Sequence, residues 1–136
     1  MTRGRERRLF LLAAALGATL SCGGKATGPV AGNIVVSLQT PNSGSDGAIL
    51  VLLAGPAAPT SLSAGPGLTL WQLPINGQTT NSVALTGTLV NGPILIIGVE
   101  DVNKVGDYGV VIQDVAANGT YALRNKSSYS VTVTKQ

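Results

Sequence analysis

The stretch SVALTGTLVNGPILIIGV, residues 82–99, holds two aliphatic runs on either side of one Asn-Gly pair. Each run is rich in the β-branched and large apolar residues that are favoured in strands. Because Asn and Gly both tolerate positive φ, Asn91-Gly92 between such runs predicts a hairpin turn. The spacing of the apolar residues shows no sustained helical period. The stretch therefore predicts β-structure on both sides of a turn.

Runs of the same kind recur along residues 33–136, separated by clusters of turn residues. They predict eight strands, at residues 33–39, 48–54, 68–73, 82–90, 93–99, 108–115, 120–124 and 129–135. The longest loop, 55–67, has room for a brief extra strand around Leu62. The run at 48–54 is apolar on both faces, which predicts a central strand.

Eight strands in about 100 residues without crossover helices predict an all-β fold. We expect an antiparallel immunoglobulin-like or similar Greek-key sandwich, with a barrel as the alternative. The last run alternates cleanly, which places Tyr129, Val131 and Val133 on one buried face. The polar segment 101–109 is expected to be a hairpin loop, with Gly106 in the left-handed backbone conformation.

The net charge of +3 comes entirely from the first eight residues, where four arginines outnumber Glu6. From Cys22 onward, five basic residues balance five acidic residues, so the sum is zero. The predicted β-domain therefore lacks the basic surface that a nucleic-acid backbone requires. No nucleic-acid partner is expected.

The N-terminal segment has the layout of an export signal. The basic stretch RGRERR (3–8) is followed by LFLLAAALGATL (9–20), which carries no charge. Spanning a bilayer takes about 20 apolar residues, so this run is short for a transmembrane helix and fits the apolar core of a signal peptide. A buried or amphipathic N-terminal helix is the alternative.

The sequence TLSC (19–22) resembles the cleavage box of bacterial lipoprotein signal peptides. In that family a short box of small residues ends in a cysteine, which is lipidated and becomes the new N-terminus. Ser21 and Cys22 match this pattern, whereas Thr19 stands where the family usually has an aliphatic residue, and Leu20 is larger than the common residue there. The resemblance covers residues 1–22 alone.

This resemblance implies that residues 1–21 are a discarded signal peptide and that Cys22 carries a lipid such as palmitate. Residues 22–32 then form a flexible Gly- and Pro-containing tether to a β-sandwich domain at 33–136. The protein would be exported and anchored to the cell membrane or outer membrane, on the periplasmic side or the cell surface. An ordinary secretory signal cut nearby is the alternative.

Other roles for Cys22 fit the sequence less well. An intrachain disulfide would need a second cysteine, and the chain has one. A metal site or an activated thiol usually needs histidine, and the chain has none. The domain itself is similar, at residues 40–56 and 127–134, to uncharacterised secreted and lipid-anchored β-domain proteins of environmental bacteria, a likeness that brings no function with it.

Segment 101–109, DVNKVGDYG, offers the clearest candidate for a metal site. Asp101, Asn103 and Asp107 have oxygen atoms of the kind that calcium prefers. The spacing departs from a calcium loop, because Val105 occupies a ligand position and Ile112 replaces the bidentate Glu. A plain polar loop is the favoured interpretation, with a weak calcium site as the alternative. No cofactor is expected.

Catalysis is not expected either. A Ser-His-Asp triad is excluded because histidine is absent. Glu100 and Asp101 are adjacent and would point to opposite faces of an extended segment, so a hydrolase using carboxylates from 100–114 is the weakest hypothesis. The first hypothesis is a membrane-anchored envelope lipoprotein with a non-catalytic structural or binding module. The second is a domain that recognises an envelope protein or a glycan, with Trp71 as either a core-edge residue or the centre of the binding face.

Overall fold

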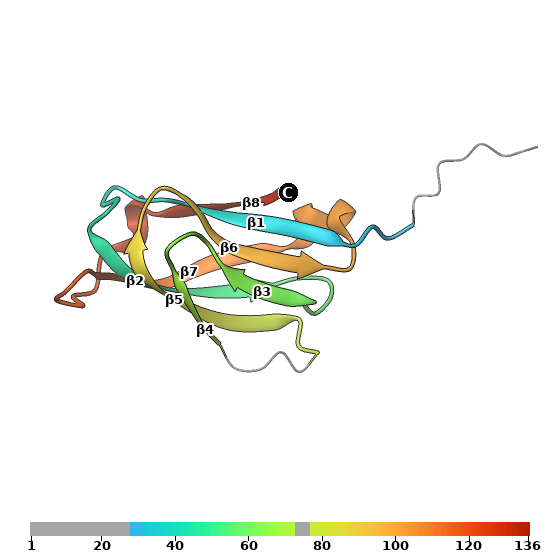
Figure 1. The fold of residues 1–136 in the computed structure, drawn as a ribbon, viewed down its shortest axis with the longest axis horizontal. Coiled ribbons are helices and arrows are strands. Elements are labelled where there is room, and N and C mark those ends of the chain that lie inside the picture. Colours follow the sequence, from blue (N-terminus) through green and yellow to red (C-terminus); the bar gives the residue numbers. More distant parts are fainter. Residues whose placement is uncertain (1–27, 73–76) are drawn as a thin grey trace, which may run out of the picture.

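The computed structural model describes residues 28–72 and 77–136. They form two antiparallel four-stranded sheets packed face to face (Figure 1). The strands are β1 (Gly32–Gln39), β2 (Asp46–Ala54), β3 (Ser61–Ala64), β4 (Thr69–Gln72), β5 (Thr80–Leu89), β6 (Gly92–Val99), β7 (Gly109–Ala117) and β8 (Ser130–Lys135). Two short 3-10 segments, η1 (Val102–Asp107) and η2 (Lys126–Ser128), complete the described elements. Among these residues no helix is long and apolar enough to cross a membrane.

The prediction of an antiparallel sandwich of about eight strands is confirmed. The described strands form two separate sheets, with orders β3-β6-β1-β8 and β4-β5-β2-β7, so the alternative of a barrel is wrong. Strand pairs nest inside one another along the chain: β4 with β5, β3 with β6, β2 with β7 and β1 with β8. The pairs β1–β6 and β2–β5 then join these units into the two sheets.

The hairpin predicted at Asn91-Gly92 is wrong, because β5 and β6 lie in different sheets. Gly92 does have a positive φ of 126°, as a tight turn requires. The turn is held by the β1–β2 loop and not by a β5–β6 ladder. The Asn91 side chain accepts a hydrogen bond from Thr40 N at 2.7 Å, and Asn91 N donates to Ser43 Oγ at 3.1 Å. These contacts redirect the chain from one sheet to the other.

Two further details of the sequence prediction need correction. The segment 101–109 is a crossing between sheets that contains η1, not a hairpin, and Gly106 has no positive φ. Residues 120–124 are not a strand, because Tyr121 has a positive φ of 55° and Leu123 makes a single bridge to Ala116. The eighth strand is instead β3, at the place where the brief extra strand was expected.

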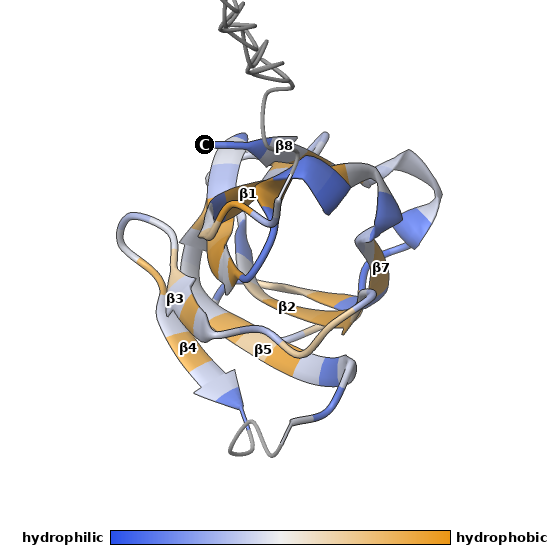
Figure 2. Ribbon diagram, turned by 90° about the vertical axis from the view of Figure 1, so that its right-hand side faces the viewer, coloured by the Kyte–Doolittle hydropathy of each residue, from blue (hydrophilic) through white to orange (hydrophobic). Residues whose placement is uncertain are grey.

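The core lies between the sheets and follows the two-residue alternation of the strands. Its fully buried residues include Ile34, Val36 and Leu38 of β1, Ile49, Val51 and Leu53 of β2, Val83, Leu85 and Leu89 of β5, and Ile94, Leu95 and Ile97 of β6. Tyr129 is also buried, as its predicted inward position requires. In Figure 2, which looks from the end at which β1 begins, apolar residues mark the strands of both sheets around this core.

Candidate binding face and predicted site residues

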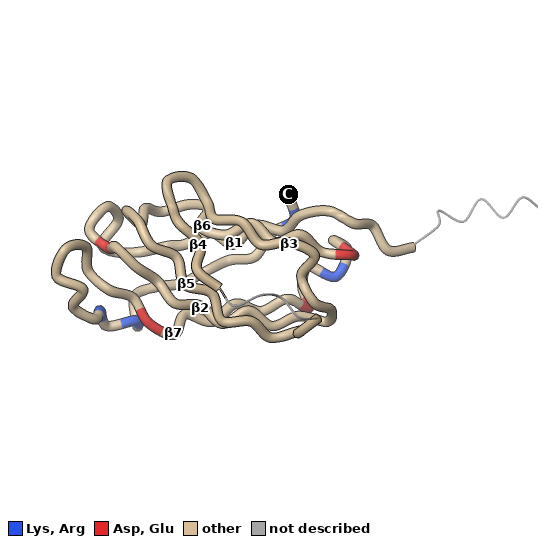
Figure 3. The backbone as a smooth tube through the Cα atoms, turned by 60° about the horizontal axis from the view of Figure 1, so that its bottom comes forward, with Lys and Arg blue, Asp and Glu red and all other residues tan. Residues whose placement is uncertain are grey.

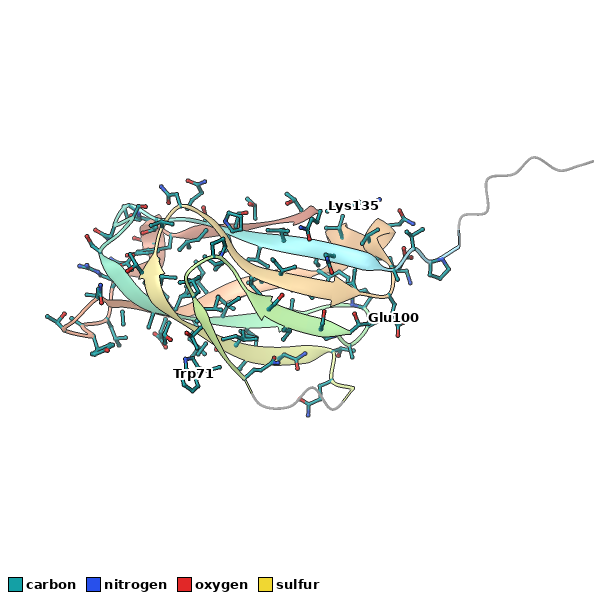
Figure 4. The ribbon with its side chains drawn as sticks, in the orientation of Figure 1. Trp71, Glu100 and Lys135 are labelled. Carbon is teal, nitrogen blue, oxygen red and sulfur yellow. The ribbon has the colours of Figure 1, made fainter. Side chains whose placement is uncertain are left out.

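Trp71 projects outward from β4, the edge strand of one sheet, and 60% of its surface is exposed (Figure 4). Its indole Nε1 donates a hydrogen bond to Thr86 Oγ1 on the neighbouring strand at 2.9 Å. That bond directs the ring toward β5, while much of the side chain remains open to solvent. Trp71 therefore lies outside the core, exposed at the edge of a sheet face.

The strand registers show which residues share that face with Trp71. Trp71 pairs with Ala84, Ala84 with Leu50, and Leu50 with Asp114, so one row crosses all four strands of sheet β4-β5-β2-β7. Cross-strand partners point to the same side of a sheet. The next rows on either side hold Ser82, Leu52 and Val111, and Thr69, Thr86, Ala48 and Ala116. We call these residues, with Leu123 at the β7 edge, the outer apolar face.

Two more exposed side chains extend the outer apolar face. Val111 is 61% exposed on β7, and Leu123, which pairs with the outward-facing Ala116, is 73% exposed. On the same face, a shallow hollow of about 210 Å³ is lined by Ala48, Ile49, Leu50, Ala84, Asp114 and Ala116. Contiguous apolar patches larger than a few hundred Å² often mark interaction sites.

The outer face of the second sheet has a different composition. Its outward positions on β1, β3 and β8 are mainly polar (Asn33, Ser37, Gln39, Ser61, Ser63, Ser130, Thr132 and Thr134), whereas Val35 of β1 and Pro93 and Ile96 of β6 are apolar. Both outer faces belong to the same sandwich, and a face in contact with water is normally polar. The outer apolar face differs from that of the second sheet in carrying the exposed side chains of Trp71, Val111 and Leu123.

Charged residues avoid the middle of the sheets. Figure 3 shows Lys, Arg, Asp and Glu gathered mainly toward the two ends of the domain. Among the outward-facing residues of the described strands in sheet β4-β5-β2-β7, Asp114 is the one charged side chain. Lys126 stands near it, since its ammonium donates to the carbonyl of Gln113. The outer apolar face is thus nearly neutral.

The predicted calcium residues lie within η1 (Asn103 and Asp107) or directly before it (Asp101), at the end of the domain where β1 begins. One carboxylate oxygen of Asp101, Oδ1, accepts hydrogen bonds from Val30 N at 3.2 Å and Asn103 N at 3.0 Å. These two backbone bonds lower the pKa of Asp101 below its ordinary value of 3.8. Val102 N also donates to Val30 O, so this loop fixes the start of the domain before β1 begins. The observed role of Asp101 is therefore a structural one.

The other acidic residues of 100–114 are distributed over different parts of the surface. Asp107 ends η1, Glu100 lies exposed just before it (Figure 4), and Asp114 belongs to the outer apolar face. Within residues 28–72 and 77–136, no three Asp, Glu, Cys or His side chains are close enough to share a metal ion. Beside this loop, burial together with Glu100 and Asp101 raises the pKa of Tyr108.

Sequence reasoning missed the buried carboxylate of Asp46, which accepts hydrogen bonds from three other side chains. This carboxylate is completely buried at the start of β2. Its Oδ2 accepts hydrogen bonds from Thr40 Oγ1 at 3.0 Å and from the Tyr129 hydroxyl at 2.9 Å. Its Oδ1 accepts from Arg124 Nε at 3.0 Å, and Asn42 Nδ2 donates to the Tyr129 hydroxyl at 2.8 Å. The cluster ties the β1–β2 loop to the segment before β8.

The predicted lipid-attachment residue, Cys22, lies outside the described residues. So does the whole segment 1–21 that was predicted to be a signal peptide. No protein-family model, curated protein sequence or solved structure matches the chain.

Proposed function

We propose that this chain is an envelope lipoprotein, anchored to a membrane through lipid on Cys22, that carries a non-catalytic β-sandwich as a structural or binding module. The observation that carries the proposal is the order of the N-terminal residues: a basic stretch, twelve uncharged residues and the box ending in Cys22. Two or more acyl chains hold a protein stably on a bilayer, and lipoproteins of this class carry such a set.

The geometry of the domain is compatible with attachment by its N-terminal side. The extension enters beside η1, where Val30 is bound to both Asp101 and Val102. In Figure 1 the first described residues, 28–31, lead into β1 at one narrow end of the sandwich, and the β1–β2 loop lies at the other end. A tether at this position would leave both outer sheet faces and the far end accessible to partners.

The test is labelling of the full chain in cells with a fatty-acid probe. Wild type should be labelled, and Cys22→Ser should not. A double variant, Cys22→Ser with Thr134→Cys, restores a thiol at an exposed position on β8. It should also remain unlabelled, which would show that position 22 is required and not merely a cysteine. Equal labelling of wild type and Cys22→Ser, or no labelling of wild type, would overturn the anchor.

A second candidate function is recognition of a protein or glycan through the outer apolar face. The observation favouring it is the exposed indole of Trp71 in the same cross-strand row as Ala84 and Leu50. Aromatic side chains provide large contact area at low cost in conformational entropy. Trp71 is the only tryptophan of the chain, so its fluorescence reports directly on this face. Binding of a partner should shift its emission to shorter wavelength, and a partner that binds Trp71→Ala as well as wild type would exclude this face.

A further inference from the structure

We propose that the outer apolar face binds the same face of a second copy of this chain, giving a two-fold symmetric dimer. In this dimer Trp71 of each copy enters the hollow on β2 of the other. The inference deepens the second candidate function, because it names the partner of that face. It does not depend on the lipid anchor.

The positions of Trp71 and the hollow fit this symmetry. Trp71 is on β4 at one side of the sheet, and the hollow lies over β2, between β5 and β7. Trp71, Ala84, Leu50 and Asp114 belong to one row. A two-fold axis parallel to the strands, in the plane between the two faces, exchanges the β4 and β7 sides within that row. It therefore carries each Trp71 to the hollow of the other copy, as an isologous interface requires.

The chemistry of the hollow favours a protein surface over a sugar. Alanine and leucine side chains supply most of its lining, and Asp114 is the one polar side chain among them. A sugar ring would need more hydrogen-bonding groups to replace the water around its hydroxyls. An indole buries apolar area, and the single N–H of Trp71 is already bonded to Thr86 Oγ1 within its own copy, so the ring brings no unpaired donor into the hollow.

The charge of the face does not oppose self-association. Asp114 and the nearby Lys126 give each copy one negative and one positive group at the β7 edge. The rest of the face carries no charge on its outward-facing strand residues. Two copies can thus approach without net repulsion, whereas a face with several like charges would resist pairing with itself.

The size of the face sets the expected affinity. Four strands about 4.8 Å apart, over about 25 Å of strand length, enclose roughly 500 Å². A face-to-face pair would therefore bury about 1,000 Å² in total, at the lower end of specific interfaces. We expect a weak dimer, with a Kd on the order of 100 µM in solution. Confinement of tethered copies to one membrane would raise their effective concentration.

The test uses the full chain with Cys22→Ser, which removes the lipid site and any intermolecular disulfide. Sedimentation equilibrium, at concentrations from about a tenth to about ten times the expected Kd, should show a closed monomer–dimer equilibrium. The emission of Trp71 should move to shorter wavelength over the same range. Trp71→Ala and Ala84→Glu, made in this background, should each weaken the dimer by at least about tenfold, because one removes the inserted ring and the other buries a charge.

Ser37→Glu is the matched control. Ser37 is a partly exposed, outward residue on an inner strand, as Ala84 is, but it lies on the outer face of the other sheet. It should leave the dimer unchanged. Thermal melts of all variants separate loss of pairing from loss of folding, and Trp71→Ala, at an exposed edge position, keeps the test independent of Ala84.

Three results would overturn the dimer. The first is a monomer throughout the concentration range. The second is equal weakening by Ser37→Glu and Ala84→Glu. The third is a monomer that is retained on purified peptidoglycan through Trp71, which would assign the face to a glycan and keep the second candidate function without the dimer. Failure of the lipid label changes none of these measurements, so the two proposals fail separately.

Discussion

Substitution of the buried Asp46 tests most directly how much its hydrogen bonds and ion pair stabilise the fold. In Asp46→Ala the hydroxyls of Thr40 and Tyr129 lose an acceptor inside the protein, and Arg124 loses its ion-pair partner. Removal of one member of a buried charge pair costs about 3–5 kcal/mol. The Arg124 side chain is one-third exposed (33%), so water can solvate its charge in part when Asp46 is removed. We therefore expect the free energy of unfolding to fall by about 3–4 kcal/mol.

A loss of that size is a large share of the roughly 5–15 kcal/mol that stabilises a typical domain. It should lower the midpoint of thermal unfolding by about 12–25 °C. Urea unfolding followed by circular dichroism measures the free energy, with an unchanged slope showing that only stability changed. Asp46→Asn keeps one acceptor oxygen and should lose less than Asp46→Ala.

Asp107→Ala is the control, since Asp107 is an exposed acid at the end of η1. Its effect should stay within about 0.5 kcal/mol. The reasoning would be refuted if Asp46→Ala unfolded within 1 kcal/mol of wild type, on the order of an ordinary surface change. The reasoning would also be refuted if Asp107→Ala lowered the free energy of unfolding as much as Asp46→Ala does.

Three more outcomes are expected. Gly65→Ala should destabilise the domain by about 1–3 kcal/mol in urea unfolding, because its Cβ would collide with the backbone of β6, whereas Gly106→Ala has open space and should be neutral. Asp101, with its lowered pKa, should stabilise the fold at pH values above its unfolded pKa and lose that contribution as the pH falls through its folded pKa; NMR titration should show this, with the amide of Val30 shifting alongside. Tyr129→Phe should cost about 1–3 kcal/mol, since it removes the hydroxyl that joins Asn42 to the buried carboxylate.

The strands of residues 82–99 were predictable within a few residues, because alternation and β-branched content are local properties. That these two strands lie in different sheets was not predictable from the sequence. The Asn91-Gly92 turn chemistry is the same whether the chain returns beside itself or crosses to the other layer. Contacts with Thr40 and Ser43, about 50 residues earlier in the sequence, make that choice, and no local pattern encodes them.

The sequence predicted part of the Asp46–Tyr129 cluster and part of the environment of Trp71, but for different reasons. Alternation predicted that Tyr129 points inward, and a buried hydroxyl needs a hydrogen-bond partner, so a polar partner could have been expected. Its identity as Asp46, 83 residues away, depends on the tertiary fold. For Trp71 the sequence left two positions open. The residues that share a face with Trp71 follow from its register with Ala84, and register is a property of strand pairing that a single strand does not contain.

The nested pairing of the strands also constrains how the domain can assemble. β4 and β5 are joined by a short connection, so their pairing closes the smallest loop, and each further nested pair spans a longer stretch of chain. β1 emerges first but gains its outer partner only with β8, the last described strand. A high share of such distant pairings slows folding. If the chain is threaded through a membrane from its N-terminus, as the proposed export requires, several apolar strands stay uncovered until the final segment arrives, and exposed apolar strands of this kind are prone to aggregate.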